Sequence, residues 1–444
     1  MRLGYNFLLD FVLACMSASA SAQTGAPQNS GTCRVAADSE LTKSISQHAV
    51  GIWGLNQKFE HYWYSHEQPV WLKVPTLAEL TSSLGKLNSQ RVAVLFYAVQ
   101  DGRLCTWLIS ARGIRARHVQ DVNVSYLIRD VLRIRRTLGV YDPVDSGEEK
   151  ARYSSGTAST RSLPSNDVLR DSLVATLSSQ LLPSAIISRV LSDSITVLAV
   201  VPIMEFSKVP FALLNDGTGR YLIDRVALTF VPSFESFVDT AVRRSAPLSS
   251  ALIAAPRLKE PLPGAILEVH NIANVLAVNP LPAESATTTH ITSLLTKRRP
   301  LGLFYLATHG VSSGSDPLDS SYLELSDAKW YAREIGGLSL TGGPLVVLSA
   351  CQTGLGKSFG VGSTGLARAW YNAGASAVVM TLWNIGDAPT VRLMTDFVSA
   401  ARAQSAEEAL RDAILKAIAR RAHPSTWAAF EVFGPPVRSF FIQN

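Results

Sequence analysis

A histidine and a cysteine each follow an apolar stretch of strand length, and together they form a pair that could do chemistry. His309 comes directly after residues 302–308 and precedes Gly310, and Cys351 comes directly after residues 345–350. An imidazole beside a thiol can take its proton, and the resulting thiolate is a strong nucleophile. These residue types therefore predict nucleophilic attack on a carbonyl group, provided that the fold brings them together.

Each of the two residues also has a purely structural interpretation. Cysteine is often buried as a small apolar side chain, and a histidine after a strand can simply bond to a backbone group. The runs before His309 and Cys351 are continuously apolar, which is typical of parallel strands buried on both faces. Because open α/β sheets place their sites at the carboxyl ends of such strands, we expect both residues at one sheet edge.

Strands and helices alternate through the C-terminal part of the chain, which predicts an α/β fold with a largely parallel sheet. The expected strands cover residues 251–255, 301–307, 345–350, 375–382 and 427–433. Expected helices cover 265–276, 363–373 with Ser363 or Thr364 as cap, a segment opened by Pro389, and a segment after the capping box of Ser405 and Glu408.

The N-terminal part has a weaker pattern. We expect residues 40–85 to be helical, with aromatic side chains used for packing, and residues 142–166 to form a surface loop. Asp101-Gly102 lies between two apolar runs and predicts a β-hairpin. Other expected elements are strands at 92–98, 104–109, 195–201 and 226–231 and helices at 121–138 and 169–181.

Composition narrows the class of protein. The chain has 444 residues, of which 47% are hydrophobic and 17% charged, so it can bury a large core and is not of the disordered type. The net charge is 41 − 35 = +6, and the arginines are scattered, so nucleic acid is not an expected partner. No Cys-x-x-Cys or His-x-x-x-His spacing occurs, which disfavours a metal site.

The N-terminus resembles a bacterial export signal. Arg2 precedes a mostly apolar stretch, and Ala20-Ser21-Ala22 has the form of a cleavage site that would leave Gln23 first. We therefore expect a periplasmic or secreted protein without a transmembrane span. Two alternatives are a lipoprotein anchored through Cys15, and a cytoplasmic protein if residues 1–22 are not a signal. In an oxidising compartment Cys33 and Cys105 could pair, which would leave Cys351 as the free thiol.

A glycine-rich segment could be mistaken for a nucleotide site. Residues 360–365 fit Gly-x-Gly-x-x-Gly, and Asp387 follows at about the distance expected of a ribose-binding acid. The dinucleotide motif needs its first glycine at the end of a strand, whereas here residues 351–359 intervene after the strand that ends near Ala350. We therefore expect a flexible loop before a helix.

Several motifs together resemble the CHAT domain, a caspase-like cysteine peptidase family related to separases, gingipains and caspases. The resemblance covers roughly residues 91–433. The segments that carry it are Leu306-Ala307-Thr308-His309-Gly310, Val347-Leu348-Ser349-Ala350-Cys351-Gln352-Thr353-Gly354, Gly365-Leu366-Ala367-Arg368-Ala369-Trp370, Val378-Val379-Met380-Thr381-Leu382-Trp383, His423-Pro424-Ser425-Thr426-Trp427-Ala428-Ala429-Phe430, Val201-Pro202, Pro210-Phe211-Ala212-Leu213-Leu214 and Tyr221-Leu222-Ile223-Asp224-Arg225.

The resemblance implies a caspase-like three-layer α-β-α sandwich with a mostly parallel central sheet. We expect a signal peptide at 1–22, a helical region at 23–88, a smaller pseudo-caspase-like half at 89–250 and a catalytic half at 251–444. Many members of the family carry helical repeats that act as a sensor, but this sequence contains no such repeats.

The resemblance also implies roles for individual residues. His309 would be the base and Cys351 the nucleophile of a cysteine endopeptidase, with the N–H groups of Gly310 and Cys351 as oxyanion donors. The endopeptidase would need no cofactor or metal, would act on a protein or peptide substrate, and would be controlled by a regulatory protein partner. Trp383 and Asp387 would line the pocket for the residue before the cut bond, although Asp387 could instead cap the helix opened by Pro389.

The sequence departs from the family pattern, and a second function stays open. The family often has acidic residues where Val361 and Gly386 stand here, which weakens any preference for a basic residue before the cut bond. The alternative to a peptidase is a catalytically idle CHAT-fold scaffold or protein-binding module, since a fold alone does not determine activity.

Overall fold

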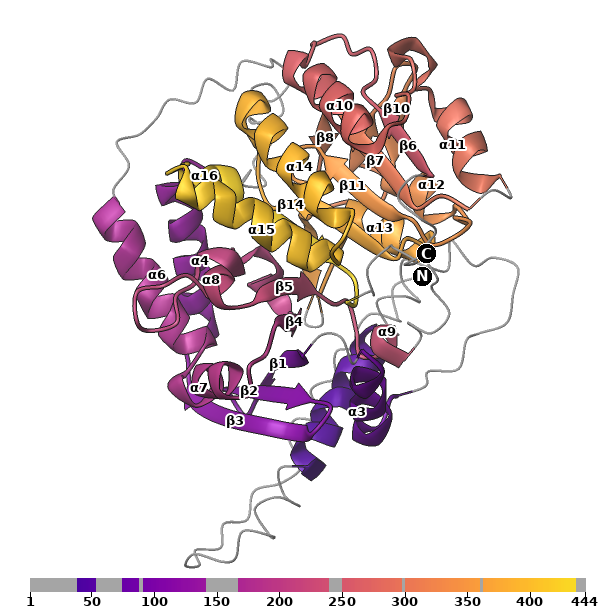
Figure 1. Cartoon of the computed structure of the whole chain (residues 1–444). Coiled ribbons are helices and arrows are strands. Elements are labelled where there is room, and N and C mark those ends of the chain that lie inside the picture. The colour runs from indigo at the N-terminus through magenta and orange to yellow at the C-terminus, as the bar shows by residue number, and fades with distance from the viewer. Residues whose placement is uncertain are drawn as a thin grey trace, which may run out of the picture.

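One ten-stranded sheet runs through the part of the chain that the structure describes, with helices on both faces (Figure 1). This structure is a computed structural model, and it describes residues 38–52, 74–87, 91–140, 167–238, 250–297, 300–359 and 362–436. The strand order is β3-β2-β1-β4-β5-β15-β14-β11-β7-β6. The strands are β1 (Val92–Gln100), β2 (Arg103–Ser110), β3 (Gly113–Asp121), β4 (Val197–Val201), β5 (Ala227–Phe230), β6 (Ala251–Ala254), β7 (Leu303–Ala307), β11 (Leu345–Ser349), β14 (Ala377–Thr381) and β15 (Phe430–Phe433).

Strand direction divides this sheet into two halves. β1, β4, β5 and β15 pair in parallel, and so do β14, β11, β7 and β6. β15 and β14 are antiparallel, so the two parallel groups run in opposite directions. The N-terminal group is extended by the antiparallel strands β2 and β3. The mostly parallel sheet confirms the predicted fold class, and it places the carboxyl ends of the two groups at opposite edges.

Alternating side chains of the strands fix the helices to the two faces. On β7, Phe304 contacts Trp370 with ring centroids 5.1 Å apart, whereas the next residue, Tyr305, bonds to Glu268 on the other face. Helix α13 (Leu366–Asn372), which carries Trp370, therefore lies opposite α10 (Pro263–Leu276), which carries Glu268. The result is a three-layer α-β-α sandwich.

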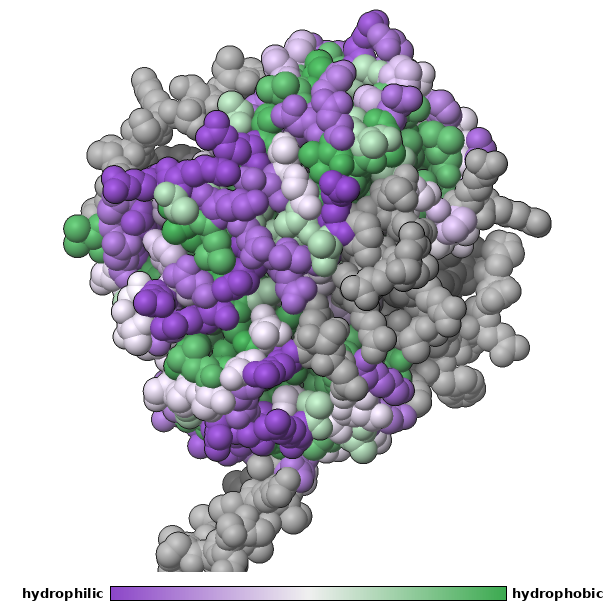
Figure 2. Space-filling model, viewed as in Figure 1, coloured by the Kyte–Doolittle hydropathy of each residue, from purple (hydrophilic) through white to green (hydrophobic). Residues whose placement is uncertain are grey.

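Helices α10, α14 (Asp387–Ala401) and α15 (Ala406–Ala419) lie side by side on one face of the sheet (Figure 1). Apolar residues gather on the visible surface over α10, where Ile266 and Leu267 are exposed (Figure 2). Further helices are α3 (Leu77–Lys86), α4 (Val124–Thr137), α6 (Asp167–Leu181), α7 (Ser184–Ser192), α8 (Leu222–Arg225), α9 (Glu235–Val238), α11 (Thr288–Thr296), α12 (Ala332–Gly336), α16 (Pro424–Trp427), the 3-10 helices η1 (Met204–Lys208), η2 (Phe211–Leu213) and η4 (Ala283–Ser285), and a helix at 38–52.

Local sequence signals explain several boundaries. Asp101 and Gly102 have φ angles of 50° and 76°, as a tight hairpin turn with two left-handed residues requires, and they join β1 to β2. The predicted capping box of Ser405 and Glu408 begins α15. Asn123 caps α4 by accepting bonds from two backbone N–H groups.

Three expectations about elements need correction. The glycine-rich stretch before the expected helix at 363–373 was expected to form a flexible loop, but Gly356–Phe359 and Gly362–Gly365 are the paired strands β12 and β13. The following helix α13 begins at Leu366 after Gly365, so neither Ser363 nor Thr364 caps it. The expected strand at 427–433 is the end of α16 followed by the short strand β15, because Pro424 begins a helical turn there. The sequence interpretation also missed β3.

Several predictions fall outside the described residues. These are the export signal at 1–22 with Gln23, the lipid anchor at Cys15, the thiol of Cys33, the aromatic residues between 53 and 73, and the loop at 142–166. Among the described residues, no single helix has the length and apolar character to cross a membrane, although the bent pair α6 and α7 passes by length and composition alone. The described residues also contain no cluster of three or more His, Cys, Asp or Glu side chains suited to a metal ion.

Candidate active site

Adjacent strands deliver His309 and Cys351 to the same edge of the sheet. β7 and β11 pair in parallel, with Ala307 opposite Ser349. His309 lies two residues beyond Ala307, and Cys351 lies two residues beyond Ser349, so the two leave the sheet at the same level. The Thr308 N–H donates to the Ser349 carbonyl at 3.2 Å and continues the pairing one residue further. The fold therefore brings the two predicted residues to neighbouring positions.

Gly310 packs directly against the backbone of the cysteine turn. A Cβ atom at this position would lie 2.6 Å from the Cys351 carbonyl oxygen and 3.3 Å from the Ala350 side chain. Real Cβ atoms do not approach a backbone oxygen so closely, so only glycine fits here. The glycine after the histidine is therefore what allows the two motifs to touch.

The imidazole of His309 is oriented by a backbone carbonyl. Its Nε2 atom lies 3.1 Å from the carbonyl oxygen of Glu260, in the segment before α10. A carbonyl oxygen can only accept, so Nε2 carries the proton and donates it, and a neutral ring then has its lone pair at Nδ1. This is the arrangement of a base held in one tautomer, with the other nitrogen available to take a proton.

A tight turn carries Cys351 away from the sheet. The next residue, Gln352, has a φ angle of 58°, an uncommon conformation for a residue other than glycine. The turn is held to β14 because the Thr353 hydroxyl accepts from the Thr381 N–H at 3.0 Å, and the Thr381 hydroxyl donates to the Ala350 carbonyl at 2.7 Å. Uncommon backbone conformations that persist are often found at functional sites.

The environment of the Cys351 thiol favours its protonated form. Burial raises the pKa of Cys351 above its ordinary value, and the nearby carboxylate of Asp387 raises it further, although a hydrogen bond from the Ile385 backbone acts to lower it. A thiol with a raised pKa is a poor nucleophile at neutral pH on its own. Chemistry at Cys351 therefore depends on a neighbouring base.

Trp383 is not placed as the sequence interpretation expected. Its side chain is 1% exposed, its indole N–H donates to the Ser425 carbonyl at 2.8 Å, and the Arg135 guanidinium lies 5.4 Å from the ring centroid. A side chain enclosed in this way presents no wall to a substrate. Trp383 is therefore a core residue, in contact with Arg135 of α4 and Ser425 of α16.

Asp387 joins the beginnings of two helices. It is the first residue of α14, and its Oδ2 atom accepts a hydrogen bond of 2.6 Å from the Gly264 N–H in the first turn of α10. A carboxylate is stabilised at helix N-termini by free N–H groups and by the helix dipole. One of its oxygens is thus already bonded, close to the thiol whose pKa it raises. Its predicted role in substrate choice stays a prediction.

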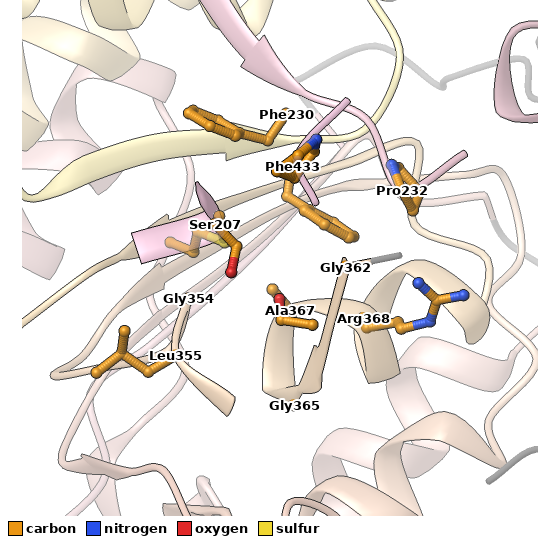
Figure 3. Close-up of a pocket in the computed structure, with 13 residues that line it drawn as sticks. Ser207, Phe230, Pro232, Gly354, Leu355, Gly362, Gly365, Ala367, Arg368 and Phe433 are labelled. Carbon is orange, nitrogen blue, oxygen red and sulfur yellow. The ribbon is translucent and has the colours of Figure 1, made fainter. Parts of the chain in front are cut away.

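The chain between Cys351 and α13 reaches across to the N-terminal half. Ser358 on β12 donates to the Glu205 carboxylate on η1 at 3.0 Å. Figure 3 shows the pocket beneath this hairpin, with Phe230, Pro232 and Phe433 on one side and Gly354, Leu355 and Ala367 on the other. The pocket is mainly apolar and lies where the two halves meet, next to the turn that carries the thiol.

Sequence reasoning missed two groups that bond to the site or to the strands beneath it. The Glu260 carbonyl is a backbone atom, so no residue type could have revealed it. Glu268 did leave a signal, because it is the one carboxylate on the buried stripe of α10 formed with Ala265, Val269 and Ile272. An acid on the apolar stripe of a helix needs a polar partner beneath it.

Comparison with known proteins agrees with this architecture. The family model described as "CHAT domain" matches residues 169–435. Tetratricopeptide repeat protein 28 of Mus musculus is 27% identical over 293 residues, which are 53% of this chain and 12% of that protein; the Homo sapiens protein is 25% identical over 290 residues. The chain therefore matches only a small part of these relatives' length.

Two solved structures extend the comparison. Separase in the separase–securin complex of Saccharomyces cerevisiae has a TM-score of 0.54 and 11% identity, over 81% of this chain and 31% of that chain. The Arg-specific cysteine proteinase gingipain R (RgpB) of Porphyromonas gingivalis has a TM-score of 0.41 and 14% identity, over 60% of this chain and 69% of that chain.

Proposed function

The chain belongs to the CHAT domain family, and we propose that it is a cysteine endopeptidase that cleaves peptide bonds in a specific protein partner. The observation that carries this proposal is the shared level at which β7 and β11 deliver His309 and Cys351. The hydrogen bond that fixes the His309 ring supports it, because this bond leaves Nδ1 available as a base.

In the proposed reaction, His309 takes the thiol proton of Cys351. The thiolate attacks the substrate carbonyl carbon, and the carbonyl oxygen gains the negative charge. Backbone N–H groups of Gly310 and Cys351 would stabilise that charge. The protonated His309 then gives its proton to the leaving amine, and water hydrolyses the resulting thioester. Because burial and Asp387 raise the pKa of the thiol, the base is essential to this scheme.

A peptide carrying a thiol-reactive group tests the proposal. Labelling of Cys351, located by mass spectrometry, should be lost in Cys351→Ala and also in His309→Ala. Two controls exist within the described residues: Cys105→Ala removes a buried thiol elsewhere in the fold, and His290→Ala removes a histidine on α11. Both controls should label normally. Labelling that survives in His309→Ala would contradict the dyad.

The second candidate is a scaffold or protein-binding module with an idle dyad. It is favoured by the raised pKa of the thiol and by the curated relatives, whose names describe repeat proteins. A library of peptides separates the two functions, since a scaffold would show His309-independent labelling and no cleavage. The cleavage profile would also identify the residue preferred before the cut bond.

We further propose that the protein is exported and has a regulatory protein partner. Export is supported by the sequence of residues 1–22. Mass spectrometry of the natively produced protein should find Gln23 at the N-terminus, or a lipid on Cys15 in the lipoprotein version. An intact Met1 on most molecules would contradict export. Co-purification from native cells, followed by identification of the bound protein, tests the partner.

A further inference from the structure

A buried carboxyl group joins the two strands that deliver His309 and Cys351. Glu268 lies on α10 and is 2% exposed. Its Oε1 atom accepts a hydrogen bond of 2.6 Å from the Tyr305 hydroxyl on β7. The hydroxyl of Ser349, at the end of β11, also donates to the Glu268 carboxyl group. One side chain of the covering helix is thus bonded to both strands.

These bonds lie close to the site along the chain. Tyr305 precedes His309 by four residues, and Ser349 precedes Cys351 by two. Val347 pairs with Tyr305, so Tyr305 and Ser349 are near neighbours on the face of the sheet that α10 covers. A change in the Glu268 bonds therefore acts on the last residues of both strands before the site.

Helix α10 contacts the site at two further points. The Glu260 carbonyl, just before the helix, holds the His309 ring, and the Gly264 N–H in its first turn holds Asp387. A shift of α10 along its axis would move all three contacts together. Glu268 adds a polar contact between the helix and the strands to the apolar packing of α10, because its partners lie in the sheet itself.

We propose that Glu268 is a positioning residue for the His309–Cys351 pair, which it holds in register by bonding α10 to β7 and β11; this inference rests on the proposed function. The residue touches neither the substrate nor the reacting atoms. Its effect on catalysis comes through the strand ends and through the helix that orients His309.

The groups that face Glu268 can be named from each element packed against it. β7 contributes Tyr305, β11 contributes Ser349, and α14 contributes the charge of Asp387, while β6 contributes apolar side chains only. Burial raises the pKa of Glu268 to about 7, and the two hydroxyl bonds act to lower it. When Glu268 is ionised it can accept from both hydroxyls, and this is the form in which both strands are held.

The test compares variants of the full chain by peptide cleavage and by the rate at which iodoacetamide alkylates Cys351 at pH 8, measured site by site by mass spectrometry. Glu268→Gln should lower kcat by up to about 100-fold, as expected for misplaced reacting groups, with KM nearly unchanged. Tyr305→Phe should have a similar effect, and the double variant should be no worse than either single variant. Glu407→Gln, which changes a buried acid on α15, is the matched control and should behave as wild type.

Three outcomes overturn the inference. They are a Glu268→Gln variant with wild-type kcat and alkylation rate, fully additive effects with Tyr305→Phe, and faster alkylation in Glu268→Gln, which would indicate a simple charge effect on the thiol. Failure of the proposed function is distinguishable, because it means no cleavage by the wild type. The alkylation rates of Glu268→Gln and Glu407→Gln would then still decide whether Glu268 positions the site.

Discussion

The two halves of the sheet contain the same kind of buried strand, but different residue types follow the strands in each half. β4 and β5 in the N-terminal half are fully buried and mostly apolar, as are β7 and β11 in the C-terminal half. After β4 and β5 the chain continues with Pro202 and with Val231-Pro232, which offer no titratable group. After β7 and β11 it continues with His309 and Cys351. The candidate site is thus formed by the residues beyond the strands, and the strands themselves are alike in the two halves.

The covering helices differ in the same way. α10 places Glu268 against the strands of the C-terminal half, with hydroxyl partners on β7 and β11. α4 in the N-terminal half instead sends Arg135 across the junction, where it donates to the Leu382 carbonyl at 2.9 Å. The helix of the C-terminal half therefore bonds to the strands of its own half, whereas the helix of the N-terminal half bonds to the loop after β14. Substitutions in each half test this division.

The largest effect is expected at the contact between the two motifs. Gly310→Ala would place a Cβ atom 2.6 Å from the Cys351 carbonyl. The strand ends must separate, so we expect activity to fall about 100-fold and the free energy of unfolding to fall by about 1–3 kcal/mol. Peptide cleavage and urea unfolding measure the two effects.

Gly314→Ala is the control for that substitution, because nothing lies within 4 Å of its Cβ position. It should leave both quantities close to wild type. If activity and the free energy of unfolding fall equally in Gly310→Ala and Gly314→Ala, the contact between Gly310 and Cys351 is not the cause of the loss.

The next effect concerns the stability of the C-terminal half as a function of pH. Burial raises the pKa of Glu268 to about 7 from an ordinary 4.5, so between these values the folded protein holds a proton that the unfolded chain has released. The free energy of unfolding should therefore fall as pH rises through this window, by roughly 3 kcal/mol in all, and stay level above it.

Urea unfolding at pH 5 and pH 8 measures this fall. Glu268→Gln should remove it, whereas Tyr305→Phe should move the window upward, because the Tyr305 hydroxyl acts to lower the pKa of Glu268. An unchanged pH dependence in Glu268→Gln would assign the effect to other groups.

A smaller effect is expected at the junction of the halves. Arg135→Met leaves the buried Leu382 carbonyl without its donor, which should cost about 1–3 kcal/mol of the free energy of unfolding. Burial raises the pKa of the neighbouring Glu431 well above its ordinary value, so Glu431→Gln should change little at neutral pH. Arg133→Met, at a partly exposed ion pair on the same helix, is the control and should lie within about 0.5 kcal/mol of wild type. A larger loss in Arg133→Met than in Arg135→Met would contradict the support role.

The smallest expected effect concerns the loop after β14. Asp387→Asn keeps an acceptor for the Gly264 N–H but removes the charge that raises the pKa of Cys351. The pKa of the thiol should fall, and alkylation of Cys351 at pH 7.5 should be faster, by roughly one- to tenfold for a shift of up to about one unit. Matched Arg and Leu peptides test substrate choice at the same time. Rates that change in the same proportion would exclude Asp387 from that choice.

Much of the site was readable from the sequence because it depends on strand ends. Apolar runs that stop at His309 and Cys351 predicted both strands and their shared edge. The role of the Glu260 carbonyl and the identity of the partners of Glu268 depend on how α10 lies across the sheet, which no local pattern encodes, although the place of Glu268 on an apolar stripe did mark it as a residue with a buried polar partner. Trp383 was misjudged for the same reason, since its ring lies against Arg135, which is 248 positions earlier in the chain. The glycines at 356–365 gave a loop signal, although their close backbone contacts are those of a hairpin.

The placement of β15 has a consequence for how the protein is made. β15 completes the edge of β5, and the Thr229 hydroxyl donates at 2.6 Å to the carbonyl of Gly434, which is 205 residues later. At a synthesis rate of about 5–20 residues per second, that edge waits roughly 10–40 s for its partner. An unpaired strand edge invites association with other chains. The N-terminal half therefore emerges from the ribosome with an open side, and assembly of the sheet is completed only when almost all of the chain has been synthesised.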